Sequence, residues 1–575
     1  MDHTQLLTGL PLWLAVIALN FANAVASMDT WSLAFISAAV AKDLKAQDTI
    51  SWAATSALIS ATIGLCLLGY LSDVFGRRPM LYIALGLFVV GSALCGVSHF
   101  VCSAPFYYFG RAVTGFTVGS ISNLVNIVQS DFLTTKQRGR YQGVQGVSVG
   151  VGSLTGLLVA AAVVANGSDP GIGWPMQYWL QMVSGTMSIG FIWKCVPSPP
   201  ARSTEQRISI WSIDWVGIIS GTGAIVPALI IATEGERFGW RSATTIALEI
   251  CSLVCIVSFI CFGCFEPFKR FGTQPVVPIR LFKNVAIGVI LFQCLCSGMA
   301  FHVFVIYGPR YLETFTDQTK LGAAGWMAFY VVTHATWSSL SPLVIELLDR
   351  KMKRKVPNVQ SYRDIAVFSF LIWMIAMLIL SLLTRPAPLA GFIILEIMVG
   401  MGTGGVFQNS INAIRSQVTA EDMASATSAR NVIRYLGGGI GTAVVRPFMK
   451  RMRLKSLPSR LHSYADQTFS KADAAHLSSA DLADVKAADW AGYKAVFGFA
   501  CAAAGLAMLV CLFLYIWKSS VSEASNEQTD GIELSDEETP RIDSWLEMQS
   551  DGSSDRESTA KTNQLGSNAV PVGLP

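Results

Sequence analysis

Charged residues are scarce in this chain. Only 14% of its 575 residues are Asp, Glu, Lys or Arg, whereas 52% are hydrophobic, and the mean hydropathy is +0.48. Soluble globular domains carry about 25% charged residues. The low charge therefore argues against a string of soluble domains, which the length alone would suggest, and favours a protein of the lipid bilayer.

Sequence signatures of cofactor and metal sites are also missing. No GxxxxGK[ST] phosphate-binding loop occurs, which argues against an ATP-driven pump. "CFGC" at 261–264 has no second cysteine pair, and a zinc site needs four ligands. "GMGTGG" at 400–405 follows no predicted strand, so close helix packing explains it better than nucleotide binding. We expect no metal, no cofactor, no catalytic residue and no nucleic-acid partner, and hence no enzyme.

Long apolar runs, by contrast, recur from Leu10 to Trp517. A helix crosses a bilayer with about 20 apolar residues. Only helices and closed barrels satisfy their own backbone in lipid, and these runs lack the alternation of barrel strands. The sequence thus predicts an all-α polytopic membrane protein. The predicted spans lie at roughly 11–36, 51–71, 80–98, 104–129, 141–165, 176–196, 214–233, 243–265, 284–306, 322–345, 365–383, 389–412, 425–446 and 493–517.

The charged residues outside the spans predict the orientation. Lysine and arginine are concentrated in alternate loops, which places the N-terminus in the cytosol. Asn166 of the sequon Asn-Gly-Ser then falls in an outer loop, where it is a candidate glycosylation site. From Lys518 the chain is acidic and rich in serine, which is typical of a disordered, here cytosolic, tail.

One short charged link stands out between two apolar runs. "GYLSDVFGRRP" at 69–79 places Asp73 four residues before Arg77 and Arg78, and the link after the tenth span places Asp349 four residues before a Lys-Arg pair. Repeated halves are typical of transporter folds, in which the substrate binds between them. We expect the glycines to let helices approach closely and the charges to hold the two halves together at the cytosolic face.

This link resembles the signature loop between spans two and three of the major facilitator superfamily. The matching residues are Gly69, Leu71, Asp73, Gly76, Arg77 and Arg78. "GRAVTG" at 110–115 is similar to the superfamily's fourth-span motif, with Arg111 as its arginine. The resemblance implies that the loop engages Asp131, at the exit of the fourth span, to form a cytosolic gate.

Further segments resemble the fourteen-span drug:proton antiporters, especially fungal ones. These segments are 213–240, 266–284 and "VIRYLGGGIGTAVV" at 432–445. "MDTW" at 28–31 puts Asp29 where that branch has a first-span aspartate.

The fifth-span antiporter motif departs from the pattern of this branch. It keeps Gly152 and Gly156 but has Leu157 in place of the proline and Ala160–Ala161 in place of two glycines. The small packing face survives, whereas the bend usually associated with antiport is put in doubt.

The resemblance implies a division into domains. A six-helix bundle at 1–200, two added helices at 201–270 and a second bundle at 271–517 precede the tail at 518–575, and a long outer loop covers 447–492. It also implies a monomeric, proton-driven exporter of drugs, toxins or secondary metabolites in the plasma membrane, working by alternating access. Two alternatives stay open: import of basic amino acids or other cations into a vacuole, and a membrane sensor that transports nothing.

Ionisable residues at bilayer depth are costly and mark candidate sites. Asp29 and Arg111 are the candidate proton-coupling pair, and Glu396 is the acid that could line the second half of the cavity. His334 and His302 have unperturbed pKa values suited to proton transfer. For each of these residues the alternative is a structural hydrogen bond or, for Arg111, a tie between helices.

Overall fold

The fold was analysed in a computed structural model, which describes residues 9–47, 49–133, 135–165, 173–197, 214–264, 284–351, 359–418, 423–464 and 477–530. The described residues form helices joined by short links, and they contain no strand. The first eight helices are α1 (Gly9–Asp43), α2 (Ser51–Phe75), α3 (Arg77–Val101), α4 (Ala104–Phe132), α5 (Thr135–Ala165), α6 (Pro175–Cys195), α7 (Trp215–Phe238) and α8 (Ala243–Cys264). The others are α9 (Val285–Phe315), α10 (Lys320–Lys351), α11 (Val359–Leu382), α12 (Leu389–Phe407), α13 (Asn409–Arg415), α14 (Met423–Ser456), the 3-10 helix η5 (Ser459–Tyr464) and α16 (Ser479–Asp530).

Each predicted span coincides with a helix, so the all-α architecture is confirmed. Within the described part of the chain, nine helical segments are long and apolar enough to cross a membrane. The twelfth span is divided into α12 and α13 at Gln408. The Phe407 carbonyl there accepts a hydrogen bond from Arg430 of α14, and a side chain inserted into the backbone ladder is a common cause of a helix break.

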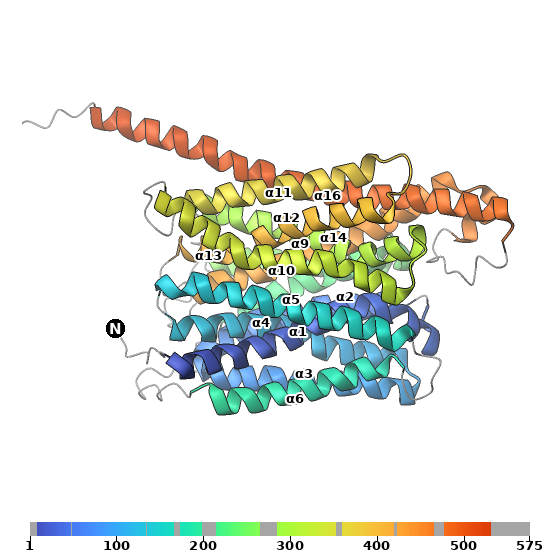
Figure 1. Ribbon diagram of the computed structural model, residues 1–575, viewed down its shortest axis with the longest axis horizontal. Coiled ribbons are helices and arrows are strands. Elements are labelled where there is room, and N and C mark those ends of the chain that lie inside the picture. The colour runs from blue at the N-terminus through green and yellow to red at the C-terminus, as the bar shows by residue number, and fades with distance from the viewer. Residues whose placement is uncertain are drawn as a thin grey trace, which may run out of the picture. The chain divides into compact units, whose positions relative to one another are not determined.

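The N-terminal half is a bundle of α1 to α6 (Figure 1). Its helices approach closely through glycine. A Cβ atom at Gly115 of α4 would lie 2.4 Å from the Ala57 carbonyl oxygen of α2, and one at Gly64 of α2 would lie 1.9 Å from the Phe116 carbonyl oxygen. These approaches bring α2 and α4 together beside Arg111.

The C-terminal half comprises α9 to α14 and the first part of α16, drawn from yellow-green to orange in Figure 1. Helices α9 and α14 pack through Gly298, Gly437 and Gly441, whose positions leave no room for a side chain. Helix α16 joins the half through aromatic contacts, such as Tyr493 against Tyr311 at 5.9 Å between ring centroids.

The two added helices pack against each other, and α7 also contacts both halves through α2 and α14. Leu229 of α7 fills the space beside Gly439 of α14. Helix α8 instead exposes a row of apolar residues, among them Ile250, Leu253 and Val257. Such a surface suits contact with lipid, because unpaired apolar faces of this size are rare on soluble proteins.

Two segments are more helical than the sequence predicted. Much of the expected outer loop at 447–492 is helix, because α14 continues to Ser456, η5 follows and α16 starts at Ser479. A buried ion pair joins the two ends of the segment, with Arg453 Nη2 2.7 Å from Asp489 Oδ1. Arg453, one of the basic residues of this segment, therefore has a structural role: it ties α14 to α16.

The start of the predicted disordered tail is also helical. Helix α16 runs to Asp530 rather than stopping near Lys518. Extending an existing helix requires no new nucleation, so a polar sequence can continue it. The remaining tail, 531–575, lies outside the described residues. The contacts divide the chain into one compact unit at 1–515 and a second unit that starts at Ile516.

Candidate functional site

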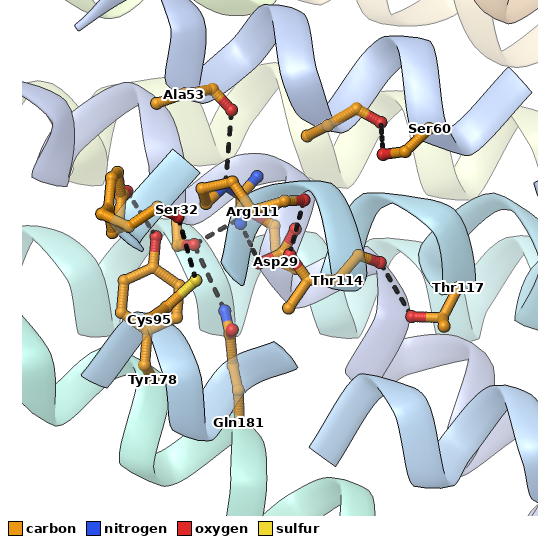
Figure 2. Close-up of polar contacts among 12 residues, drawn as sticks. Asp29, Ser32, Ala53, Ser60, Cys95, Arg111, Thr114, Thr117, Tyr178 and Gln181 are labelled. Atoms are coloured by element: carbon orange, nitrogen blue, oxygen red, sulfur yellow. Dashed lines mark hydrogen bonds and ion pairs between the residues drawn. The ribbon is translucent and has the colours of Figure 1, made fainter. Parts of the chain in front are cut away.

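An ion pair lies inside the N-terminal bundle. Arg111 Nη1 of α4 is 2.6 Å from Asp29 Oδ1 of α1, and the two side chains are only 2% and 3% exposed. Figure 2 shows the Arg111 side chain between α1 and α2, where its Nε is 3.5 Å from the Ala53 carbonyl oxygen. At 2.6 Å, the Arg111–Asp29 contact is a charge-assisted hydrogen bond, which is strong in a buried setting.

Polar side chains of α1, α4 and α6 form hydrogen bonds next to this pair. Ser32 donates to the Asp29 carbonyl oxygen at 2.9 Å, and Gln181 Nε2 of α6 donates to Ser32 Oγ at 3.3 Å (Figure 2). The hydroxyls of Tyr107 and Tyr178 lie 2.7 Å apart nearby. Four helices of one bundle therefore converge on Asp29 and Arg111.

The two glycines of the fifth-span motif bring α5 against α1 at the level of Asp29. A Cβ atom at Gly156 would lie 2.2 Å from the Met28 carbonyl oxygen, and one at Gly152 would lie 2.0 Å from that of Ala24. Leu157, in the place of the usual proline, is fully buried, and α5 continues unbroken to Ala165. The motif thus acts here as a packing surface.

In the C-terminal half, His334 and Glu396 have different surroundings. His334 Nδ1 of α10 forms a 2.8 Å hydrogen bond with Thr403 Oγ1 of α12. Glu396 of α12 is fully buried, and neither carboxyl oxygen has a hydrogen-bond partner. His302 of α9 forms a hydrogen bond with the Gly298 carbonyl oxygen. The structure therefore does not bring Glu396 together with Asp29 or Arg111.

Sequence reasoning missed two arginines of α14. Arg430 is 1% exposed and donates to Ser410, Asn431 and the Phe407 carbonyl. The Arg434 guanidinium lies over the rings of Phe407, at 4.4 Å, and Tyr435, at 4.9 Å from the ring centroid. Both arginines fall within the predicted span at 425–446, where an ionisable residue at bilayer depth is the signal that could have found them.

The two halves meet along a polar seam. Asn123 Nδ2 of α4 donates to Ser428 Oγ at 3.0 Å, and Asn431 Nδ2 donates to Asn123 Oδ1 at 3.1 Å. On the other side, Ser339 Oγ of α10 donates to the Gly143 carbonyl oxygen of α5 at 2.8 Å. We call these contacts the cytosolic seam, because they lie toward the helix ends that the sequence predicts to face the cytosol.

The signature loop lies at the same end. Arg77 Nη1 donates to Ser72 Oγ at 2.8 Å, and its Nε is 3.5 Å from Asp131 Oδ2. Arg78 donates to the Trp193 carbonyl oxygen of α6 at 2.9 Å. The structure thus brings Arg77 and Asp131 together, as the resemblance implied, but these contacts lie within the N-terminal half and do not themselves join the two halves.

The glycines of the loop have distinct roles. Gly76 adopts φ of +98°, a conformation that favours glycine, at the turn between α2 and α3. A Cβ atom at Gly69 would lie 2.9 Å from Ser428 Oγ, so this glycine lets α2 approach the seam. The side chains of Asp73 and Asp349, and Asn166 with its sequon, lie outside what the structure describes.

These features define a class of protein: a multi-pass helical membrane protein of two bundles, with buried charge inside them and a charged turn at one end. No cluster of three or more His, Cys, Asp or Glu in the described segments could hold a metal ion. A family model described as "Major Facilitator Superfamily" matches residues 19–442, and the chain belongs to that superfamily.

Relatives of the chain include named fungal transporters. "Citrate exporter 1" of Yarrowia lipolytica is 30% identical over 523 residues, covering 89% of this chain and 73% of that protein. "Multidrug resistance protein fnx1" of Schizosaccharomyces pombe is 24% identical and covers 79% of this chain and 82% of its own. "Efflux pump FUS6" of Gibberella fujikuroi is 24% identical, with 76% and 75% covered. The chain is a transport protein of this kind and not an enzyme.

Solved structures support the same fold. The human organic anion transporter MFSD10 superposes with a TM-score of 0.54 at 14% identity, over 88% of this chain and 100% of that one. A proton:xylose symporter gives a TM-score of 0.53 at 15% identity, over 88% and 95%. Identities this low show the fold alone.

Proposed function

We propose that the protein is a proton-coupled exporter of small organic compounds that works by alternating access. The observation that carries the proposal is the buried Asp29–Arg111 pair, at 2.6 Å inside a bundle of a transporter fold. The names of the relatives, a citrate exporter and efflux pumps, support export of metabolites or drugs. Export also suits the plasma membrane, and the vacuolar membrane is the alternative.

The chemistry of the pair supports proton coupling. An aspartate carboxylate binds one proton, and its protonation removes the charge that Arg111 contacts. Loading Asp29 from one side of the membrane and releasing the proton to the other would then break and remake the ion pair in each cycle. The cycle requires no ATP, because the free energy comes from the proton gradient.

Burial of the pair supports alternating access. Both side chains are almost fully covered, so in this conformation neither exchanges protons or substrate freely with water. The halves contact each other at the cytosolic seam through Asn123 and Ser339. Access therefore requires the halves to move apart, which is the common behaviour of transporters built from repeated halves.

The test uses purified protein in proteoliposomes with an imposed pH gradient. The panel comprises citrate, succinate and benzoate as carboxylates, and tetraphenylphosphonium as a lipophilic cation. We expect the wild type to accumulate at least one compound against its gradient, and Asp29→Asn to lose that accumulation while it keeps downhill exchange. Asp29→Glu should retain part of the activity, since it still carries a carboxyl.

The matched control is Asp481→Asn, which removes an acid that pairs with exposed Arg460 at 2.6 Å at the start of α16. It should accumulate substrate like the wild type. Equal gradient-driven accumulation by Asp29→Asn would remove Asp29 from the mechanism and direct attention to Glu396 and His334. A wild type that moves no compound of a wide panel would instead favour a non-transporting sensor.

A further inference from the structure

Arg434 is a cation without a counter-ion inside the C-terminal half. Among the described residues no carboxylate lies within ion-pair distance of it, and its Nε is buried without a hydrogen-bond partner. Arg111 has Asp29 as its partner, and Arg453 has Asp489. The Arg434 side chain is only partly buried, and an ionisable residue at bilayer depth is rare and marks a candidate functional site.

The described contacts of the Arg434 guanidinium are with two aromatic rings. The Phe407 ring centroid is 4.4 Å from the guanidinium carbon, and that of Tyr435 is 4.9 Å away. An aromatic ring attracts a guanidinium through its face, whereas the N–H donors point outward in the guanidinium plane. No acceptor among the described residues takes a hydrogen bond from those donors. The planar fork of a guanidinium fits a carboxylate bidentately.

Two imidazoles lie against the two aromatic rings that contact this guanidinium. His334 is 5.5 Å from the Phe407 ring, and His302 is 5.9 Å from that of Tyr435, between ring centroids. Each uses Nδ1 in a hydrogen bond, to Thr403 and to the Gly298 carbonyl respectively. Nε2 of each ring has no hydrogen-bond partner among the described residues, so both rings retain polar capacity toward a ligand.

The position of Arg434 suits a transport site. It lies eleven residues from the start of α14, or roughly 16 Å along a helix that rises 1.5 Å per residue. Asn431, one turn earlier, bonds to Asn123 of the other half, and Tyr435 lies beside Gly119 of α4. Arg434 therefore lies near mid-membrane where α14 meets the N-terminal half.

Neighbouring Arg430 provides a contrast on the same helix. Its guanidinium donates to Ser410, Asn431 and the Phe407 carbonyl, so its donors are engaged within the protein. It braces the break between α12 and α13. Of these two arginines, Arg434 has no hydrogen-bond acceptor among the described residues, which separates a structural arginine from a candidate ligand-binding one.

We infer that Arg434 is the substrate-binding cation of the transporter and that the substrate class is small organic carboxylates. This inference rests on the proposed function and narrows the substrates of the proposed exporter to carboxylates. A carboxylate would accept two hydrogen bonds from the Arg434 fork, with His302 and His334 available to further oxygens of a di- or tricarboxylate. A lipophilic cation would be repelled at this position.

The test measures binding and exchange separately. Purified protein in detergent is titrated with each compound of the panel while its intrinsic tryptophan fluorescence is recorded, and equilibrium exchange of labelled compound is followed in proteoliposomes without a pH gradient. We expect the wild type to bind and exchange a carboxylate, and Arg434→Gln to weaken carboxylate binding at least tenfold. Arg434→Lys should retain weak binding, because it keeps the charge but loses the fork.

Phe407→Leu and Arg460→Gln complete the set. Phe407→Leu removes one aromatic face and should weaken carboxylate binding less than Arg434→Gln. Arg460→Gln, at an exposed arginine bound to Asp481, should bind like the wild type. Size-exclusion profiles and melting temperatures show whether each variant is folded. If Arg434→Gln is unfolded, the comparison of Arg434→Lys with the wild type decides.

The outcomes distinguish the two proposals. Wild-type exchange of tetraphenylphosphonium but of no carboxylate would overturn the carboxylate inference and leave the exporter in place. Carboxylate binding and exchange by a folded Arg434→Gln variant equal to the wild type would overturn the role of Arg434. Carboxylate exchange that a pH gradient never drives uphill would sustain the Arg434 inference and contradict proton coupling.

Discussion

At the scale of single residues, the Asp29–Arg111 pair should affect both the stability of the fold and the proposed transport. Removing one partner of a buried pair leaves an uncompensated charge, which typically costs about 3–5 kcal/mol. We expect Asp29→Asn to lower the melting temperature clearly. Replacing both partners with apolar residues, Asp29→Leu with Arg111→Met, should recover most of the lost stability, because such replacements are often neutral.

Transport measurements on the double variant distinguish the structural role of the pair from its proposed role in carrying the proton. The double variant should be stable yet fail to accumulate substrate against its gradient, since no group remains to carry the proton. The measurement pairs a thermal melt with gradient-driven uptake in proteoliposomes. Stable and fully active double-variant protein would show that the pair only ties α1 to α4.

Glu396 gives a second prediction at this scale. Both carboxyl oxygens are buried and unpaired, and an isolated carboxylate in such a place is strongly disfavoured. We therefore expect Glu396 to be neutral in this conformation and Glu396→Gln to melt within a few degrees of the wild type. A large destabilisation would indicate a charged Glu396 with a partner in another conformation. Normal uptake by this variant would exclude it from proton transfer.

How far the sequence predicts the site depends on the residue. Asp29 and Glu396 could be found because an acid inside an apolar run is conspicuous. The pairing of Asp29 with Arg111 came from the resemblance, since 82 residues separate them and no local spacing links them. The sequence does not distinguish Arg434 from Arg430, because both are arginines within one predicted span. What distinguishes them is which hydrogen-bond donors the tertiary structure leaves free.

At the scale of helices, the approach of α5 to α1 depends on glycine. A methyl group at Gly152 would overlap the Ala24 backbone, 2.0 Å away, and backbone cannot move aside cheaply. We expect Gly152→Ala to lower the melting temperature and slow transport, because α1 carries Asp29. The matched control is Gly86→Ala on α3, where a Cβ atom would meet nothing within 4 Å. It should be neutral or stabilising by up to about 1 kcal/mol. Equal melting temperatures for the two variants would contradict this account of the α1–α5 contact.

Helix existence was easier to predict than helix length. Each apolar run became a helix because lipid leaves the backbone no other partner. Hydropathy detects only the part of a helix that lies in the bilayer, however, whereas backbone hydrogen bonds continue into water. Helix α1 therefore extends to Asp43 and α14 to Ser456, well past the predicted ends.

At the scale of the whole molecule, the compact unit ends at Tyr515. A chain cut after Ser520 keeps every described contact of that unit and removes mostly polar sequence. We expect unchanged transport per molecule in proteoliposomes, with any difference confined to abundance at the cell surface. Loss of transport by the purified, folded truncation would assign the tail a direct role.

We expect the cytosolic seam to influence how the two halves are distributed between conformations. Asn123 makes two hydrogen bonds across it, to Ser428 and from Asn431. Each is worth about 0.5–1.5 kcal/mol net, and about 1.4 kcal/mol changes a ratio of two states tenfold. We therefore expect Asn123→Ala to shift the population toward a form open to the cytosol. Arg77→Ala removes the contact with Asp131 at the end of α4, the helix that carries Asn123. It should therefore loosen this end of α4, act in the same direction and slow turnover at normal protein levels.

Distance measurements between the halves test this prediction directly. Spin labels at Phe75, at the end of α2, and at Lys351, at the end of α10, report the separation of the helix ends predicted to be cytosolic. The matched control is Asn126→Ala, one turn along α4, whose Nδ2 bonds only to the Ser122 carbonyl of its own helix. Asn123→Ala and Arg77→Ala should populate longer label distances, whereas Asn126→Ala should keep the wild-type distribution. Identical distributions in all four proteins would mean that closure depends on apolar packing between the halves, because the polar contacts would then contribute equally to both conformations.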